Sequence, residues 1–315
     1  MIPYEWLTQA DDRIKEYIQH TPLTYDAQND LYLKWENHQL TGSFKVRGAF
    51  NKVLTLQDWE LTRGLVTASA GNHGQGVALA GRLKQAPVIV FASDHALPVK
   101  LNAMRESGAE IRLVPGGYGE AEQAGIRFSK TSGATWISPY NDGMIIAGQG
   151  TLALELLTEI PDPSATTWIV PAGGGGLISG IGCALQSISP TPRLIAVQSE
   201  ASPFLHEIYK HGSQDGVTEL PSLADGLAGP VEEGSVTIPI VQRYVTDFIL
   251  VSELEIRKAI KYAWITYHER IEGSAATALA AVITGKISFK PCIVVLTGGN
   301  IPPEDHARII QNTSL

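Results

Sequence analysis

Cysteine is scarce in this chain of 315 residues: only Cys183 and Cys292 are present, and both lie in apolar segments. Two isolated thiols in such surroundings favour buried residues in a reducing compartment over a disulfide or a cysteine-rich metal site. No uninterrupted apolar run approaches the ~18 residues of a membrane-spanning helix. The first residues also lack the basic region and apolar core of a signal peptide. We therefore expect a cytoplasmic protein.

Positive charge is also in short supply, with 24 Lys and Arg against 32 Asp and Glu and a net charge of -8. This balance argues against a general affinity for nucleic acid or an anionic membrane. Low-complexity linkers, charge blocks and obvious repeats are missing as well. We expect a globular protein whose partner is a small molecule.

Short apolar runs alternate with helix-like segments along most of the chain. Strands are predicted at residues 64–70, 87–92, 111–115, 135–138, 167–171, 193–198, 247–251 and 292–297. Helices are predicted between them, at residues 73–84, 97–107, 120–131, 148–159, 177–188 and 253–271. This alternation favours an α/β fold with mainly parallel sheets. The segment order predicts a small α/β domain at residues 53–143, inserted into a larger domain of residues 1–52 and 144–315. A ligand would then lie between the domains, where the strands end.

Lys45 is the most informative single residue, because it stands in the small and apolar run LTGSFKVRGA at residues 40–49. Its nearest acidic neighbour in the sequence is Glu36. A lysine that leaves water has a lowered pKa, and its free amine can form a Schiff base with a carbonyl group. The ordinary alternative is a surface lysine at the start of a helix, which these neighbours disfavour.

A run of four glycines, PAGGGGL at residues 171–177, follows an apolar strand-like segment. Glycines at such a junction let backbone N–H groups converge on a phosphate at the start of a helix. A reactive lysine combined with a phosphate cradle suggests pyridoxal phosphate. A dinucleotide site is the rival interpretation, but Gly180 stands one place too late for the G-x-G-x-x-G pattern.

Three further segments carry candidate ligand contacts. The run SAGNHGQG at residues 69–76 follows a predicted strand and opens a helix, which suits a bound carboxylate; a serine N-cap with packing glycines is the plain alternative. The run TGGN at residues 297–300 ends the last predicted strand and offers the neutral hydroxyl of Thr297. Glu272 either faces a cofactor or caps the following helix.

Together these segments resemble one family. The runs TGSFKVRGA (41–49), SAGNHGQG (69–76), AGQGT (147–151), PAGGGG (171–176), ADG (224–226) and TGGN (297–300) are similar to those of fold type II pyridoxal-phosphate enzymes. The most similar branch is that of the serine/threonine dehydratases (threonine ammonia-lyases) and serine racemases. The resemblance covers nearly the whole chain. It implies a tryptophan synthase β-like α/β fold, with two open, mainly parallel sheets and helices on both faces.

The resemblance also implies residue roles. The catalytic residue would be Lys45, which would bind pyridoxal 5'-phosphate as a Schiff base and move the α-proton of the substrate. The cofactor-binding residues would be Phe44, Lys45, Asn72, Gly173, Gly174, Gly175, Gly176 and Thr297. The substrate-binding residues would be Ser69, Ala70, Gly71, Asn72 and His73. No metal ligand is expected.

Two departures from the family pattern narrow the branch to the dehydratases, and a third leaves the side-chain specificity open. Ala70 stands where racemases of the family carry a second serine. Glu200 is followed six residues later by His206, so the acidic pair of the racemase divalent-metal site is incomplete. Glu272 is followed by Gly273, where many dehydratases have proline.

These features predict an ammonia-lyase that eliminates water from a β-hydroxy amino acid such as L-threonine or L-serine, to give a 2-oxo acid and ammonia. The alternatives are serine racemisation, dehydration of another hydroxylated amino acid, and a non-catalytic protein that binds a cofactor or an amino acid. We also expect a homo-oligomer, with a dimer favoured.

Overall fold

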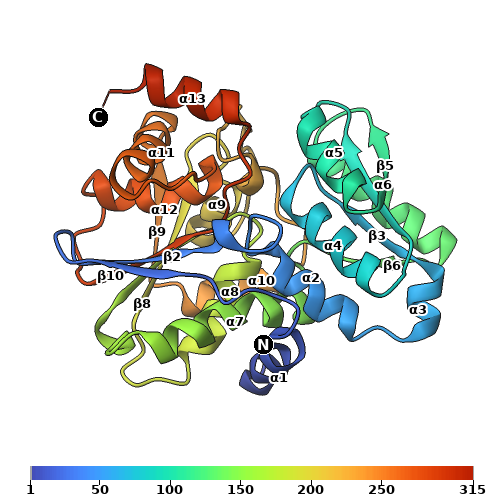
Figure 1. The fold of residues 1–315 in the computed structure, drawn as a ribbon, viewed down its shortest axis with the longest axis horizontal. Coiled ribbons are helices and arrows are strands. Elements are labelled where there is room, and N and C mark those ends of the chain that lie inside the picture. Colours follow the sequence, from blue (N-terminus) through green and yellow to red (C-terminus); the bar gives the residue numbers. More distant parts are fainter. Residues whose placement is uncertain (1, 315) are drawn as a thin grey trace.

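The computed structural model describes residues 2–314, which form two sheets side by side (Figure 1). The larger sheet has the order β1-β2-β10-β7-β8-β9, with strands β1 (Leu23–Asp26), β2 (Leu31–Trp35), β10 (Cys292–Leu296), β7 (Thr167–Pro171), β8 (Arg193–Ser199) and β9 (Asp247–Val251). The smaller sheet has the order β5-β4-β3-β6, with strands β5 (Ala109–Val114), β4 (Val88–Ser93), β3 (Leu65–Ala68) and β6 (Thr135–Trp136). Among these pairs only β1 and β2 are antiparallel. The predicted α/β fold with two mainly parallel sheets is confirmed.

Helices cover both faces of the larger sheet. The first side carries α1 (Tyr4–Ile14), α7 (Gly143–Glu159), α8 (Gly176–Leu185), α9 (Phe204–His211) and α10 (Thr237–Tyr244). The second side carries α11 (Glu253–Tyr267), α12 (Gly273–Ile283) and α13 (Pro303–Asn312). The central strand β10 shows why: Ile293 and Val295 pack on the first side, whereas Val294 and Leu296 pack on the second. Because successive strand residues face opposite sides, an apolar run forms a strand buried on both faces.

The smaller sheet is covered by α3 (Asp58–Arg63), α4 (Asn72–Leu83) and α5 (Pro98–Glu106) on one face and by α6 (Tyr118–Ser132) on the other. Its four strands all lie within the segment 53–143. We retain the division into an inserted domain at 53–143 and a larger domain of 1–52 and 144–315 as a proposal. Three short 3₁₀ helices complete the chain, at Glu36–His38, Pro163–Ala165 and Asp225–Leu227.

Helix α2 (Lys45–Leu54) lies between the two sheets and packs on both α4 and α7. A Cβ atom on Gly148 of α7 would lie 2.7 Å from the Cα of Gly48 of α2, so these two helices can cross this closely only with glycine at the contact. The run AGQGT at residues 147–151 thereby gains a packing explanation. It holds α2, and with it Lys45, against α7, one of the helices that cover the larger sheet.

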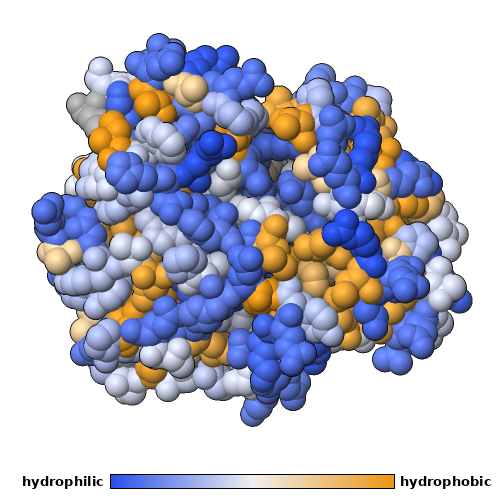
Figure 2. Space-filling view, viewed as in Figure 1, coloured by the Kyte–Doolittle hydropathy of each residue, from blue (hydrophilic) through white to orange (hydrophobic). Residues whose placement is uncertain are grey.

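Figure 2 shows that one face of the molecule is mostly hydrophilic, with hydrophobic side chains gathered over the region of α2 and α4. Across residues 2–314, no helix combines the length and apolar character required to cross a membrane.

Candidate active site

A cavity of about 440 Å³ lies between the two sheets. Its lining includes Ser69 just after β3 and Ser93 at the end of β4, both from the smaller sheet. It also includes Ala172 just after β7 and Thr297 just after β10, both from the larger sheet. The carboxyl ends of parallel strands from both sheets thus meet at one place, and this is where α/β folds commonly bind their ligands.

Lys45, the first residue of α2, lines this cavity. Its Nζ donates to the carbonyl oxygen of Pro139 at 3.2 Å and lies 5.2 Å from the centre of the Phe44 ring. Burial lowers the pKa of Lys45 to about 8, and the negative charge of Glu272 opposes this shift only in part. The amine therefore loses its proton far more readily than a lysine in water.

The glycine run 173–176 connects β7 to the start of α8, and all four glycines line the cavity with their backbone atoms. A Cβ atom at Gly174 would lie 2.4 Å from ring carbons of Tyr140, and one at Gly173 would lie 2.9 Å from the Cα of Leu227. Gly175 has a φ of 86°, which side-chain-bearing residues rarely adopt. The first N–H groups of α8 have no partner within the helix, so this segment forms an anion cradle that only glycine permits.

Asn72 and Glu272 meet on another wall of the cavity. Asn72 begins α4, and its Nδ2 donates to Glu272 Oε1 at 2.7 Å, while its Oδ1 accepts from Asn300 Nδ2 at 2.7 Å. Burial, helped by the negative charge of Asp225, raises the pKa of Glu272 to about 7. Glu272 precedes α12, but its side chain makes no capping hydrogen bond. Its carboxyl group faces the cavity, which favours the first of the two interpretations of this residue.

The loop of residues 69–73 leads from β3 into α4. The Oγ of Ser69 accepts from the backbone N–H of Gly71 at 3.0 Å, and Ala70 is exposed in the cavity wall. The His73 ring is buried, with its Nε2 3.2 Å from the carbonyl oxygen of Ile137. Burial and the positive charge of Lys45 lower the pKa of His73 to about 3, so the ring is neutral. We therefore propose that the His73 ring has a structural role and that only the backbone of this residue contacts a ligand.

The structure brings every predicted site residue into this one cavity: Phe44, Lys45, Ser69, Ala70, Gly71, Asn72, His73, Gly173, Gly174, Gly175, Gly176 and Thr297. The roles of these residues remain predictions. Several other lining residues were missed, among them Tyr140 and Lys100. Lys100 on α5 forms an ion pair with Asp225 of the 3₁₀ helix Asp225–Leu227, and both residues line the cavity. Asp225 belongs to the run ADG, but nothing in the sequence singles out Lys100 from other helical lysines.

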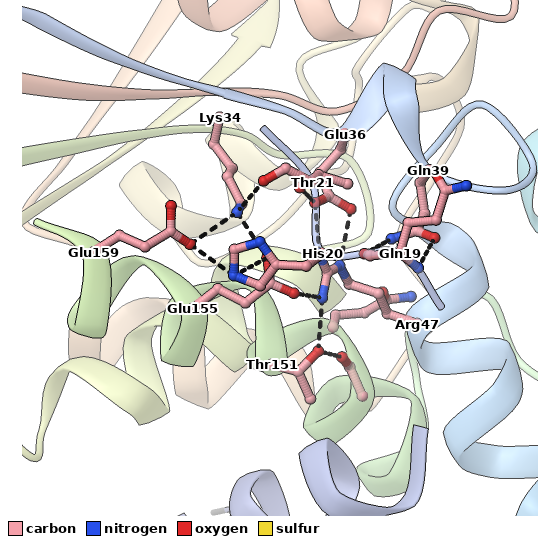
Figure 3. A network of polar contacts seen from close by, with 12 residues as sticks. Gln19, His20, Thr21, Lys34, Glu36, Gln39, Arg47, Thr151, Glu155 and Glu159 are labelled. Atoms are coloured by element: carbon pink, nitrogen blue, oxygen red, sulfur yellow. Dashed lines mark hydrogen bonds and ion pairs between the residues drawn. The ribbon is translucent and has the colours of Figure 1, made fainter. Parts of the chain in front are cut away.

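The side chain of Arg47 belongs to a network of buried charges (Figure 3). Its guanidinium donates to Glu36 at 2.9 and 2.7 Å and to Glu155 at 2.6 Å. Burial alone would lower the pKa of Arg47, but these two carboxylates outweigh it and raise the pKa. The network ties α2 to the 3₁₀ helix that begins at Glu36 and to α7, so Arg47 fixes the local fold.

The same network contains one group of possible metal ligands among the described residues. His20, Glu155 and Glu159 offer ligand atoms within 4.8 Å of one another. However, the buried ammonium of Lys34 lies 2.7 Å from Glu155 Oε2 and 3.4 Å from Glu159 Oε1. Lys34 thus supplies the positive charge that a cation would bring. Glu200 belongs to no such group within residues 2–314 and instead lies 3.8 Å from Lys286.

The residues present fit a phosphorylated aldehyde cofactor. A buried amine of lowered pKa lies in the same cavity as an anion cradle in which Gly173 and Gly174 leave no room for a Cβ atom beside Leu227 and Tyr140. An α/β fold with two parallel sheets and this pair of features between them defines a fold type II pyridoxal-phosphate enzyme.

Comparisons with known proteins agree with this class. A family profile described as "Pyridoxal-phosphate dependent enzyme" matches residues 14–298. The chain is 38% identical to an L-threonine ammonia-lyase of Thermotoga maritima over 318 residues, covering 99% of this chain and 79% of that protein. It is 38% identical to a catabolic L-threonine dehydratase of Staphylococcus aureus, covering 94% of this chain and 88% of that protein. The solved structure of maize serine racemase has a TM-score of 0.88 at 31% identity, covering 98% of this chain and 97% of that chain.

The chain belongs to the pyridoxal-phosphate dependent enzyme family. The predicted family, fold type and cofactor are confirmed.

Proposed function

We propose that this protein is a pyridoxal-phosphate-dependent ammonia-lyase, a carbon–nitrogen lyase that eliminates water from L-threonine or L-serine and yields a 2-oxo acid and ammonia. One observation carries the proposal: the amine of Lys45, with a pKa of about 8, shares a cavity with the glycine cradle. The relatives named threonine ammonia-lyase and threonine dehydratase support the same activity.

The residues that would hold the cofactor surround Lys45. Residues 173–176 would bind its phosphate, Asn72 would donate to its phenolic oxygen, and the Thr297 hydroxyl would meet its ring nitrogen. The Phe44 ring would pack beside the cofactor ring. When bound, pyridoxal phosphate supplies an aldehyde that condenses with an amine and a conjugated ring that withdraws electrons from the substrate α-carbon.

Lys45 would act as the base at the α-carbon. Because burial lowers its pKa to about 8, the Lys45 amine gives up its own proton more readily than a lysine in water and can accept the α-proton. The start of α4 would bind the substrate carboxylate through the backbone N–H groups of residues 69–73. The α-carbon would then lie between the carboxylate site and Nζ.

Thr297 favours elimination over chemistry that needs a long-lived carbanion. A neutral hydroxyl, unlike a carboxylate, does not stabilise a protonated ring nitrogen, so electron withdrawal by the ring is moderate. Once Lys45 had taken the α-proton, the β-hydroxyl would leave and gain a proton, so that the α-proton removed and the hydroxyl lost together make up one water.

Racemisation is the second candidate, because a solved serine racemase has the same fold at 31% identity. Racemisation requires a proton donor on the face of the α-carbon opposite Lys45. Ala70 lines the cavity at the place of the racemase serine and has no proton to give.

The proposal also covers the location, the assembly and the partners of the protein. We propose that the protein works in the cytoplasm, as a homo-oligomer with a dimer favoured. Its partner would be a small amino-acid substrate, with no nucleic acid or membrane surface involved.

A substrate panel tests the proposal. The purified holoenzyme is given L-threonine, L-serine and other hydroxylated amino acids, and 2-oxo acid and ammonia are measured together. We expect equal amounts of the two products with L-threonine or L-serine, and no turnover by Lys45→Ala. Cofactor binding without 2-oxo acid from any member of the panel would instead support a non-catalytic binding protein.

A further inference from the structure

The side chain of Asn300 makes two hydrogen bonds beside the cavity, and both come from its amide nitrogen. Its Nδ2 donates to the backbone carbonyl oxygen of Thr41 at 2.7 Å and to Oδ1 of Asn72 at 2.7 Å. A Cβ atom at Gly42 would lie 2.5 Å from Oδ1 of Asn300, so glycine at this position makes room for the amide. Asn300 therefore lies in a site shaped around its side chain.

The backbone around Asn300 is equally well fixed. The N–H of Gly299 donates to the carbonyl oxygen of Gly42 at 2.9 Å, and the N–H of Phe44 donates to the carbonyl oxygen of Thr297 at 3.1 Å. The N–H of Glu272 donates to the carbonyl oxygen of Gly298 at 3.0 Å. The loop after β10 thus joins the segment that leads to Lys45, and it also holds Glu272.

These bonds determine which end of the Asn72 amide faces the cavity. A backbone carbonyl oxygen only accepts, so the atom of Asn300 next to Thr41 has to be nitrogen. That nitrogen also faces Asn72, which must therefore present its oxygen to Asn300 and its own nitrogen to the opposite side. There Oε1 of Glu272 accepts from Nδ2 of Asn72 at 2.7 Å.

We infer that Asn300 is a positioning residue that orients the amide of Asn72, so that Asn72 offers an N–H group to the phenolic oxygen of the cofactor. This inference rests on the cofactor contact proposed for Asn72. Without Asn300, only the hydrogen bond to Glu272 Oε1 orients the Asn72 amide, so the amide is held less firmly with its N–H group towards the phenolic oxygen. The hydrogen bond to the cofactor is then weaker, and cofactor affinity falls.

A double-mutant cycle on the apoenzyme tests the inference. The dissociation constant of pyridoxal phosphate is measured for the wild type, Asn300→Ala, Asn72→Ala and the double variant, without any amino-acid substrate. We expect Asn300→Ala to weaken binding about tenfold, and to change it less than twofold when Asn72 is already alanine. Equal loss in both backgrounds would overturn the inference, because Asn300 would then act on the cofactor independently of Asn72.

A spectroscopic readout separates orientation from general structure. An N–H group that donates to the phenolic oxygen favours its ionised form. Asn300→Ala should therefore move the pH midpoint of the bound cofactor's phenolic absorbance change to higher pH, and it should do so only when Asn72 is present. An unchanged midpoint would contradict the inference.

Two further variants complete the design. Asn37 is the matched control, because it packs on the same loop yet bonds to Glu269 and the Arg270 carbonyl oxygen. Asn37→Ala should leave cofactor affinity unchanged, and a tenfold loss there would refute a specific role for Asn300. Asn300→Asp keeps the shape of the side chain and serves if the alanine variant fails to fold. Its carboxylate would attract Nδ2 of Asn72 and turn the amide over, so cofactor affinity should fall at least as far as in Asn300→Ala.

The outcome is independent of the lyase proposal. All readouts are taken with cofactor alone, so an enzyme that binds it normally but forms no 2-oxo acid would refute the proposed reaction only. Conversely, equal losses in the cycle would leave the reaction intact and remove only the role of Asn300.

Discussion

Replacing Glu272 with glutamine should change how the stability of the apoenzyme depends on pH. Burial, with the negative charge of Asp225, raises the pKa of Glu272 from its ordinary value of 4.5 to about 7. Between these two values the folded protein keeps the proton that the unfolded chain has released, so stability falls as pH rises through this window. At about 1.4 kcal/mol for each pKa unit, the total loss is roughly 3 kcal/mol by pH 8. The amide introduced by Glu272→Gln would carry no titrating proton and could still accept from Asn72.

The assay is denaturant unfolding of the apoenzyme at a series of pH values from 5 to 8, for the wild type and for Glu272→Gln. We expect the wild type to lose up to roughly 3 kcal/mol more than the variant over this range. Other titrating groups are common to both proteins, so the difference isolates Glu272. Glu233→Gln, at an exposed glutamate, is the control and should follow the wild type. Parallel curves for the wild type and Glu272→Gln would refute the argument that burial raises the pKa of Glu272.

Three further predictions concern the cavity. Lys45→Ala should abolish 2-oxo acid formation and the covalent link that borohydride traps; wild-type activity in this variant would refute the whole mechanism. Gly174→Asp should sharply weaken cofactor binding, because its Cβ would lie 2.4 Å from the Tyr140 ring and its charge would oppose the phosphate; unchanged cofactor affinity in a titration would count against the cradle. Ala70→Ser should raise the share of racemisation, and chiral chromatography of L-serine reactions measures it. D-serine accumulating faster than pyruvate in the wild type itself would favour the racemase alternative.

The α/β architecture could be predicted because its strands are locally distinctive. β7 and β10 are short apolar runs buried on both faces, and the alternation of such runs with helices defines parallel sheets. The sequence analysis missed β1 and β2. Lys34 lies within β2, and a lysine normally indicates an exposed position, yet here its side chain is fully buried. Its partners Glu155 and Glu159 lie more than a hundred residues away, so no local pattern could reveal the burial.

The candidate site was predictable to the extent that its residues lie in short distinctive runs. The glycines at 173–176 follow an apolar strand, and the lysine at 45 stands among small and apolar residues. Both settings can be recognised in the sequence. Lys100 shows the limit. It lines the cavity only because α5 of one sheet faces Asp225 of the other, and its ion pair depends on how the two sheets are placed in space. Tyr140 was missed for the same reason, since its ring closes the cradle from a segment between β6 and α7.

Helix α2 carries two basic residues in its first turn, and their different surroundings explain how a reactive amine is maintained. Glu36 is the nearest acidic residue to Lys45 in sequence, yet both of its carboxylate oxygens bind Arg47. Glu155 binds Arg47 as well, so two carboxylates raise the pKa of Arg47. Lys45 has no such partner, and burial lowers its pKa to about 8 against the charge of Glu272 alone. The buried network in Figure 3 thus fixes the helix that carries Lys45 while keeping negative charge away from its amine. A carboxylate of Glu36 turned towards Lys45 would favour the protonated amine and oppose its role as a base.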